Sequence, residues 1–325
     1  MKKYLAITID VEPDCSPDWR YSDPLTFRGV DTGIARRLHP LFEEFGIVPT
    51  YLLNNVVLED EPSVAVLRNL PGKYELGAHL HPEFIEPGRR FDDYAGKKGE
   101  ANLCFYPPEI ESAKIGSITA LFEKGFGYRP TAFRAGRYSA GVNTMNSLRR
   151  HGYLVDTSVT PHLCWNDASR EQPVNFTTAP EQPYLMAQDR VVGEDPSGNL
   201  LQVPISIALS KRNPWRELLS SGGGLIHPFR RTKPVWLRPH YSTAAQMIGV
   251  ARQYFQTYAQ RDAVVLNMMF HNVEVLPGLS PYTSTETQCR DYLEQLRQFF
   301  IFCRQENFNY TGLSGLYEVF KQMSS

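Results

Sequence analysis

The sequence has few cysteines and no long apolar run, and both absences narrow the class of protein. Its five cysteines are irregularly spaced and include no C-x-x-C pair, which is typical of reduced thiols and argues against a disulfide framework. No window reaches the roughly 18 apolar residues of a membrane-spanning helix. The apolar run near the start is interrupted at Thr8 and ends at Asp10, so it is too short for the core of a secretory signal. We therefore expect a cytoplasmic protein without a membrane span.

An excess of one charge is also missing. The chain carries 34 lysines and arginines against 35 acidic residues, which gives a formal net charge of -1 and a pI near 6.7. A basic surface for nucleic acid is not indicated by these values, so we predict no nucleic-acid partner. Internal repeats and low-complexity segments are absent as well, and the apolar share of 42% is that of an ordinary globular protein.

Apolar runs and helical patterns alternate along the chain. Strands are predicted at residues 4–10, 50–53, around His79, and at 131–134, 153–156, 200–205, 263–270 and 308–311. Helices are predicted at residues 31–45, 62–70, 107–124, 142–151, 242–258, 283–300 and 314–323, and Pro40 should kink or split the first of them. This alternation predicts a parallel α/β architecture, most economically one barrel domain over residues 1–325, with its site where the strands end.

Two segments interrupt this alternation, at about residues 160–199 and 206–241. They are polar or basic and rich in proline and aromatic residues, and long loops of this kind often cover a site. We expect them to form a rim over the barrel mouth. Its aromatic and basic residues are Trp165, Arg230, Arg231, Trp236, Arg238 and Tyr241. Such a rim suits a sugar ring stacked on an aromatic face, with arginines meeting an anionic group; a solvated basic loop packed by tryptophans is the alternative.

The candidate site residues fall at predicted strand ends. His79 and His81 lie two residues apart, so a strand would project both side chains to one side, where two imidazoles can bind a divalent metal. Two unrelated polar residues at a strand end are the alternative interpretation. Asp10 and Glu12 share a face in the same way at the end of the first strand.

Three further polar residues, Arg134, Asp156 and His271, also follow predicted strands. A barrel brings the ends of its strands together at one mouth, so all of these residues are candidates for a single site. Asp156 could orient His271 or cap a helix.

Taken in order, these motifs resemble those of the polysaccharide deacetylase superfamily, the NodB-homology or carbohydrate esterase family 4 proteins. They are I-T-I-D-V-E at residues 7–12, P-T-Y-L-L at 49–53, E-L-G-A-H at 75–79, F-R-A-G-R-Y at 133–138, G-Y-L-V-D-T-S at 152–158, L-Q-V-P at 201–204 and M-M-F-H at 268–271. The resemblance implies an irregular (β/α) barrel with about seven parallel strands.

Three positions depart from the usual family pattern. A valine replaces the usual metal-binding aspartate, so the resemblance implies Glu12 as its substitute, with Asp14 as the alternative. Glu83 occupies the usual place of the second metal histidine, so His81 is the expected ligand, with Glu83 as the alternative. Gly136 replaces the proline of the arginine motif.

The resemblance implies one divalent metal held by Glu12, His79 and His81. Zinc is the first expectation, with cobalt or another transition metal as alternatives. Such an ion would keep one position open for water and lower the pKa of that water.

The resemblance also assigns catalytic roles. Asp10 would be the general base, Arg134 would hold its carboxylate, and His271 would protonate the leaving amine. The oxyanion would rest on the metal and on backbone N–H groups near residues 136–138. The implied function is a metal-dependent hydrolase that removes an N-acetyl or similar N-acyl group from a sugar, in surface-polysaccharide or lipopolysaccharide biosynthesis. The carbohydrate could be anionic or nucleotide-linked. A non-sugar amide hydrolase of the same superfamily and a catalytically silent carbohydrate-binding relative are the alternatives.

Overall fold

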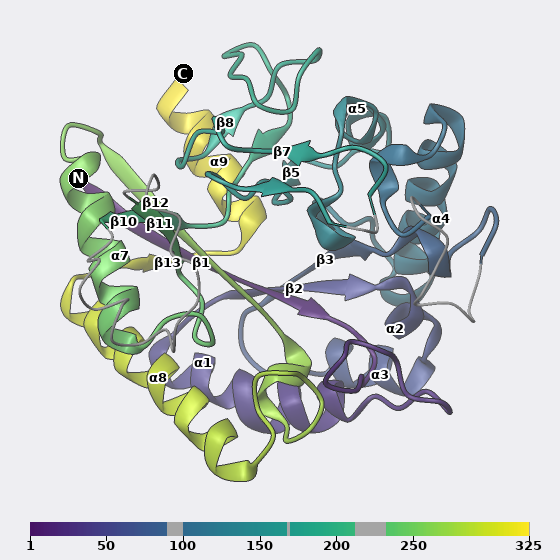
Figure 1. The fold of residues 1–325 in the computed structure, drawn as a ribbon, viewed down its shortest axis with the longest axis horizontal. Coiled ribbons are helices and arrows are strands. Elements are labelled where there is room, and N and C mark those ends of the chain that lie inside the picture. The colour runs from purple at the N-terminus through teal and green to yellow at the C-terminus, as the bar shows by residue number, and fades with distance from the viewer. Residues whose placement is uncertain (90–99, 168–169, 212–231, 325) are drawn as a thin grey trace, which may run out of the picture.

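The computed structural model describes residues 1–89, 100–167, 170–211 and 232–324. Its centre is a curled sheet with the strand order β12-β1-β2-β3-β4-β5-β9-β8, and β13 pairs with β1 beside this path. Every pair from β12 to β9 is parallel, whereas β8 pairs antiparallel with β9. Because β12 and β8 do not pair in the described residues, the sheet is a half-barrel (Figure 1). The predicted fold class, with about seven parallel strands, is confirmed: seven described strands follow one another in parallel, and β13 is an eighth that pairs parallel with β1.

The strands of this sheet are β1 (Lys2–Val11), β2 (Pro49–Asn54), β3 (Glu75–Leu80), β4 (Ala132–Ala135), β5 (Val155–Asp156), β8 (Tyr184–Leu185), β9 (Leu201–Gln202), β12 (Ala263–His271) and β13 (Asn309–Tyr310). The helices are the π-helix η1 (Gly29–Leu38), α1 (His39–Phe45), α2 (Asn55–Glu59), α3 (Glu61–Arg68), α4 (Pro108–Phe126), α5 (Val142–Arg150), α7 (Ala244–Thr257), α8 (Glu286–Gln305) and α9 (Leu313–Ser324). Four 3₁₀ turns are η2 (Pro82–Phe84), η3 (Leu103–Phe105), η4 (Gly136–Tyr138) and η5 (Asn272–Val275). In Figure 1, α7 and α8 lie on one side of the strands and α4 and α5 on the other.

Side-chain alternation along β1 separates two cores. Leu5, Ile7 and Ile9 belong to the large apolar core, which also contains the buried side chains of the surrounding helices. Tyr4 and Ala6 belong to a smaller core inside the half-barrel, which the buried leucines of α9 complete. Successive residues of a strand point to opposite faces, so the next residues on the inner face, Thr8 and Asp10, line the interior nearer the mouth.

Proline and glycine set the first helical boundaries. Over the predicted helix at residues 31–45, η1 ends at Leu38 and α1 follows at once at His39, with Pro40 in its first turn. The backbone stays helical across this junction, and the N–H of His39 donates to the backbone oxygen of Ile34. Pro40 has no N–H to donate, and the helix changes from π to α geometry where it lies. Gly46 ends α1 with a φ of 67°, a left-handed conformation that glycine adopts without steric cost.

Two predicted strands are shorter in the structure than expected. The strands predicted over residues 153–156 and 200–205 are reduced to β5 and β9, of two residues each. The N–H of Val203 still donates to Asp156, but Pro204 has no N–H to continue the ladder.

The two predicted rim segments contain short antiparallel pairs. The first contains β6 (Cys164–Trp165), β7 (Val174–Asn175) and β8, and the second contains β10 (Ile207–Lys211) paired with β11 (Thr232–Trp236). Strands of two residues carry no periodicity that a sequence could reveal. Within the described residues, no helix has the length and apolar character needed to cross a membrane. All five cysteines are unpaired, as expected.

Candidate functional site

Strand register brings the candidate residues to the same end of the half-barrel interior. Asp10 on β1 is paired in register with His271 on β12, and His79 on β3 is paired with Arg134 on β4. Glu12 lies two residues beyond Asp10 and therefore on the same inner face. All five side chains lie at or just after the carboxyl ends of parallel strands, where α/β barrels place their active sites.

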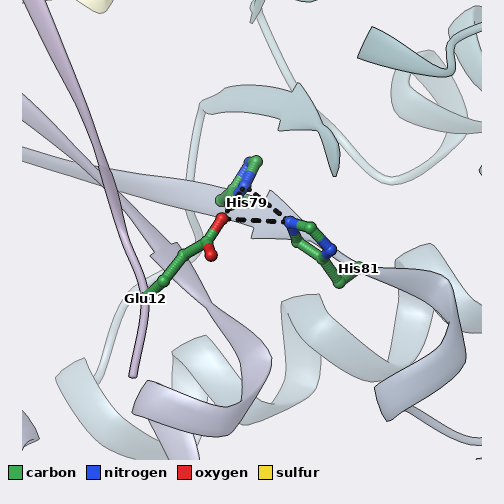
Figure 2. A group of neighbouring side chains, drawn as sticks. All are labelled: Glu12, His79 and His81. Carbon is green, nitrogen blue, oxygen red and sulfur yellow. Dashed lines mark hydrogen bonds and ion pairs between the residues drawn. The ribbon is translucent and has the colours of Figure 1, made fainter. Parts of the chain in front are cut away.

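Glu12, His79 and His81 form a compact triangle of donor atoms (Figure 2). Oε1 of Glu12 lies 3.1 Å from Nε2 of His79 and 3.1 Å from Nε2 of His81, and the two Nε2 atoms are also 3.1 Å apart. All three side chains are buried. Two imidazole nitrogens and a carboxylate oxygen, each within hydrogen-bonding distance of the other two, are brought together at one point.

This donor set fits a divalent transition metal. Around a tetrahedral zinc ion with bonds of about 2.0–2.1 Å, ligand atoms lie roughly 3.3 Å apart, close to the observed separations. The Nδ1 atom of His79 lies 3.2 Å from the backbone oxygen of Arg134. When Nδ1 donates its proton to this oxygen, Nε2 keeps a lone pair that can bind a metal. A hydrogen bond of this kind from the other ring nitrogen is what orients a metal-binding histidine.

Charge also favours a cation at this point. Burial raises the pKa of Glu12, but His81 and His79 outweigh burial and hold that pKa well below its ordinary value. Burial lowers the pKa of His81, but the Glu12 carboxylate raises it to about 9. The ionised Glu12 carboxylate thus attracts positive charge, which a metal ion can supply in place of the imidazole proton.

The alternative ligand Asp14 lies in another setting. Its carboxylate accepts hydrogen bonds from Thr26 Oγ1 (2.8 Å) and from the backbone N–H groups of Arg28 (2.9 Å) and Gly29 (2.8 Å). It therefore satisfies free N–H groups at the start of η1. The structure does not bring Asp14 into the triangle.

Glu83, the other alternative, lies behind His81. Its Oε1 is 3.7 Å from His81 Nδ1 and 2.7 Å from Nη2 of Arg137. Burial raises the pKa of Glu83, but the charge of Arg137 overcomes this effect and the pKa is lowered. Glu83 is thus an ionised outer neighbour of His81 and not a member of the triangle.

Gly136 makes room for the ring of His81. A Cβ atom at position 136 would lie 2.9 Å from Cδ2 of His81 and 2.9 Å from the backbone oxygen of Leu80. With contacts this short, a side chain at this position would require the His81 ring or the Leu80 backbone to shift. The glycine in place of the usual proline and the unusual position of the second histidine are therefore two parts of one arrangement.

Lys114 on α4 was not predicted as part of the site. Its buried Nζ donates to the backbone oxygens of Pro82 (2.8 Å), Ile85 (2.8 Å) and Pro87 (2.5 Å). One cation thereby fixes the loop that carries Glu83. A lone lysine in an amphipathic helix gives no signal of this role in the sequence.

Asp10 is held by Arg134 beside the triangle. Nη1 of the fully buried Arg134 donates to Asp10 Oδ1 at 2.6 Å, and its other donors bind Thr8 Oγ1 (2.6 Å) and the backbone oxygen of Thr157 (3.0 Å). The free oxygen, Oδ2, lies 3.8 Å from Nε2 of His79. Burial raises the pKa of Asp10, but Arg134 and the histidines outweigh burial and lower it.

His271 lies on the other side of Asp10, with its Nε2 3.9 Å from Asp10 Oδ2. Its Nδ1 lies 2.8 Å from Oε1 of Glu274, a buried residue of η5. Arg238 donates to the same oxygen, and Tyr292 donates to Oε2 at 2.8 Å. Burial raises the pKa of Glu274, but Arg238 and His271 lower it to about 2.

Glu274, and not Asp156, is the carboxylate next to His271. Asp156 accepts hydrogen bonds from Oγ (2.7 Å) and N–H (2.9 Å) of Ser158 in the turn after β5. The sequence contained a local signal for Glu274, because an acid three residues after a histidine can turn back to it within one helical turn.

The site opens into a cavity of about 290 Å³. Besides the residues above, its lining includes the aromatic side chains of Trp19, Tyr138, Trp165, Tyr241 and Tyr282. A neighbouring cavity of about 470 Å³ shares Trp165 and Tyr241 with it and is also lined by Trp236. Of the six predicted rim residues, four therefore line these two cavities, and Arg230 and Arg231 lie outside the described residues.

No family model matches the sequence, and neither does any curated protein. Solved structures do match. A Mycobacterium smegmatis protein assigned as a polysaccharide deacetylase aligns over 99% of this chain and 91% of its own, with a TM-score of 0.55 and 17% identity. The chain has the polysaccharide deacetylase fold. Puue allantoinase shares the fold over 98% of this chain and 89% of its own, with a TM-score of 0.53 and 13% identity.

A GH57-type branching enzyme from Pyrococcus horikoshii also shares the fold, over 98% of this chain and 71% of its own (TM-score 0.52, 10% identity). The names of these three proteins denote different reactions. The polysaccharide deacetylase fold therefore does not select an activity, which has to be argued from the site.

Proposed function

We propose that the protein is a metal-dependent hydrolase that removes an N-acetyl or similar N-acyl group from a sugar. The observation that supports this proposal is the triangle of Glu12, His79 and His81 with Asp10 and His271 beside it, all facing one cavity. A divalent ion bound by the triangle would activate a water molecule and polarise the acyl oxygen. The fold shared with a protein assigned as a polysaccharide deacetylase is consistent with this chemistry.

In this proposal Asp10 is the general base. Its Oδ1 is occupied by Arg134, whereas Oδ2 faces the donor triangle and is the oxygen that can accept a proton from the attacking water. The lowered pKa of Asp10 keeps the carboxylate ionised near neutral pH. Arg134 lies below Asp10 with no exposed surface, so it orients the base without contacting substrate.

His271 delivers a proton to the leaving nitrogen. Glu274 accepts the Nδ1 proton of His271, so Nε2 is the nitrogen that faces the cavity and exchanges the proton with the substrate. Nε2 lies 3.9 Å from Oδ2 of Asp10. The base and the acid therefore face the same part of the cavity, where one can take a proton from the incoming water and the other can protonate the departing amine.

We further propose that residues 160–199 and 206–241 form a rim of this single domain that binds the sugar. Trp165 and Tyr241 line both cavities, so their rings can stack on pyranose faces. Among the described residues, the arginines that line the site cavity are Arg137 and Arg238, which are paired with Glu83 and Glu274. An anionic or nucleotide-linked sugar stays a prediction from the sequence.

A non-sugar amide hydrolase is the second candidate, since Puue allantoinase shares the fold to a similar degree. Zinc as the resident metal, a cytoplasmic location and a role in surface-polysaccharide or lipopolysaccharide biosynthesis remain predictions from the sequence.

Metal analysis combined with an acyl-release assay tests the proposal. Purified protein should contain about one divalent ion per chain, release acetate from N-acetylated glycans and leave allantoin unhydrolysed. A His79→Ala/His81→Ala variant should lose both the metal and the activity, whereas Asp10→Asn should lose the activity and keep the metal. Metal-bound protein that cleaves only allantoin or another non-sugar amide would support the second candidate. Metal-free protein with unchanged glycan binding would show a silent binding relative.

A further inference from the structure

Tyr138 is the last residue of η4, the turn that follows β4, and it lines the site cavity together with Asp10 and His271. Its ring stacks on Trp165 with ring centroids 5.3 Å apart and an interplanar angle of 21°, and it lies 6.1 Å from Trp236. The ring is therefore fixed on two sides by aromatic contacts. The sequence motifs assign a role only to the backbone N–H groups near this residue and none to its side chain.

The hydroxyl of Tyr138 is buried and makes no hydrogen bond with any described residue. Burying a hydroxyl without a partner costs free energy, so each such group in a folded protein requires an explanation. Burial also raises the pKa of Tyr138. The hydroxyl thus keeps its proton and is available as a hydrogen-bond donor.

The backbone that carries this hydroxyl is strained. Arg137 and Tyr138 have φ values of 52° and 55°, two consecutive left-handed conformations in residues that are not glycine. Such conformations persist only where the surroundings enforce them, and they cluster at functional sites. Here Arg137 is held by the Glu83 carboxylate (2.7 Å) and by the backbone oxygen of Ala101 (2.9 Å).

A second donor in the same cavity has no described partner. The Nε atom of Arg238 is buried without a hydrogen bond among the described residues, although the guanidinium is bound to Glu274 through Nη2. A hydroxyl and a guanidinium N–H are both donors, so the group that completes them is an acceptor. An oxygen atom of the substrate has this chemistry.

We propose that the Tyr138 hydroxyl donates a hydrogen bond to the acyl oxygen of the substrate. This inference rests on the proposed function, in which the acyl carbon reacts next to Asp10. Tyr138 lines the same cavity as Asp10 and the donor triangle. A donor aimed at this oxygen stabilises the negative charge that develops there during hydrolysis.

Three Tyr→Phe variants, each missing one hydroxyl, test the inference. Tyr138→Phe removes the unpartnered hydroxyl in the cavity. Tyr310→Phe removes a hydroxyl that is also buried without a described partner but does not line the cavity. Tyr153→Phe removes a hydroxyl bonded to Thr119 Oγ1 at 2.9 Å, also away from the cavity. Each full-length variant is loaded with metal, and Tm, kcat and KM for acetate release from N,N′-diacetylchitobiose are measured.

We expect kcat of Tyr138→Phe to fall at least about tenfold, with KM within twofold and Tm unchanged or higher. Tyr310→Phe should match the unsubstituted protein in kcat and should not lower Tm. Tyr153→Phe should keep its kcat and lower Tm by about 1–2 °C, because it loses a hydrogen bond.

The inference is overturned if Tyr138→Phe retains its kcat, or if its Tm falls as that of Tyr153→Phe does, since the hydroxyl would then have a structural partner. An unsubstituted protein that binds metal but releases no acyl group from any glycan would overturn the proposed function itself. An active protein with an unaffected Tyr138→Phe variant would overturn only this inference.

Discussion

We predict that the buried ion pair of Glu274 and Arg238 stabilises the folded protein, and the structure gives the size of its contribution to the free energy of unfolding. Replacing Glu274 with glutamine keeps the shape of the side chain but removes its charge. The Arg238 guanidinium, which is almost fully buried, then loses its carboxylate partner. Breaking a buried ion pair in this way typically costs about 3–5 kcal/mol.

The pKa of Glu274 gives a second estimate. It is lowered from its ordinary 4.5 to about 2 in the folded protein. Because each tenfold change in the protonation equilibrium corresponds to about 1.4 kcal/mol, the ionised carboxylate contributes about 3 kcal/mol at pH 7. A carboxyl group with a lowered folded pKa stabilises the protein above its unfolded pKa, and this contribution disappears as pH falls toward 2. At pH 3.5 about 2 kcal/mol should remain.

Denaturant unfolding of the unsubstituted protein and of Glu274→Gln at pH 7 and pH 3.5 measures both quantities. We expect a loss of about 3 kcal/mol at pH 7 that becomes smaller at pH 3.5. Glu286→Gln is the matched control, because Glu286 is half-exposed in its pair with Arg37 and such a pair contributes no more than about 1 kcal/mol. A loss below 1 kcal/mol for Glu274→Gln, or one that does not change with pH, would refute this reasoning.

Three further predictions concern the donor triangle. Gly136→Ala should lower metal affinity about tenfold, measured by competition with a chromogenic chelator, because its Cβ displaces the ring of His81; unchanged affinity would show that the ring has room to move. Glu83→Gln should also weaken metal binding about tenfold, whereas Glu75→Gln, which removes a carboxylate near the barrel base, should not; equal effects would contradict a specific role for Glu83. Asp14→Asn should keep the full metal content by elemental analysis and lose about 1–2 kcal/mol of unfolding free energy; loss of the metal would return Asp14 to the ligand set.

The fold and the arrangement of the triangle could be predicted because they depend on local patterns. Strand alternation alone places His79 and His81 on one face, and the order of strands and helices predicts that strand ends meet. The sequence favours His81 as the ligand but leaves Glu83 open as the alternative. The choice between them depends on Pro82, which ends the extended backbone and begins η2, so that the Glu83 side chain turns toward Arg137.

The supporting contacts of Lys114 and Arg238 could not be predicted, because they join distant segments. Lys114 binds carbonyl oxygens about thirty residues earlier in the chain, and Arg238 meets Glu274 across 36 residues. Neither contact produces a pattern of residues that could be recognised in the sequence. The orphan hydroxyl of Tyr138 is likewise visible only when its surroundings are known.

The pairing of β1 with β12 has a consequence for the way this chain can change. Asp10 and His271 are direct neighbours in a ladder that runs in register from Lys2 and Ala263. Losing or gaining a single residue within either strand would rotate one of the two proton-handling groups to the outer face, against the large apolar core. Changes of length can therefore accumulate only in the connections, so new substrate preferences would be expected to arise there while the spacing of acid and base stays constant.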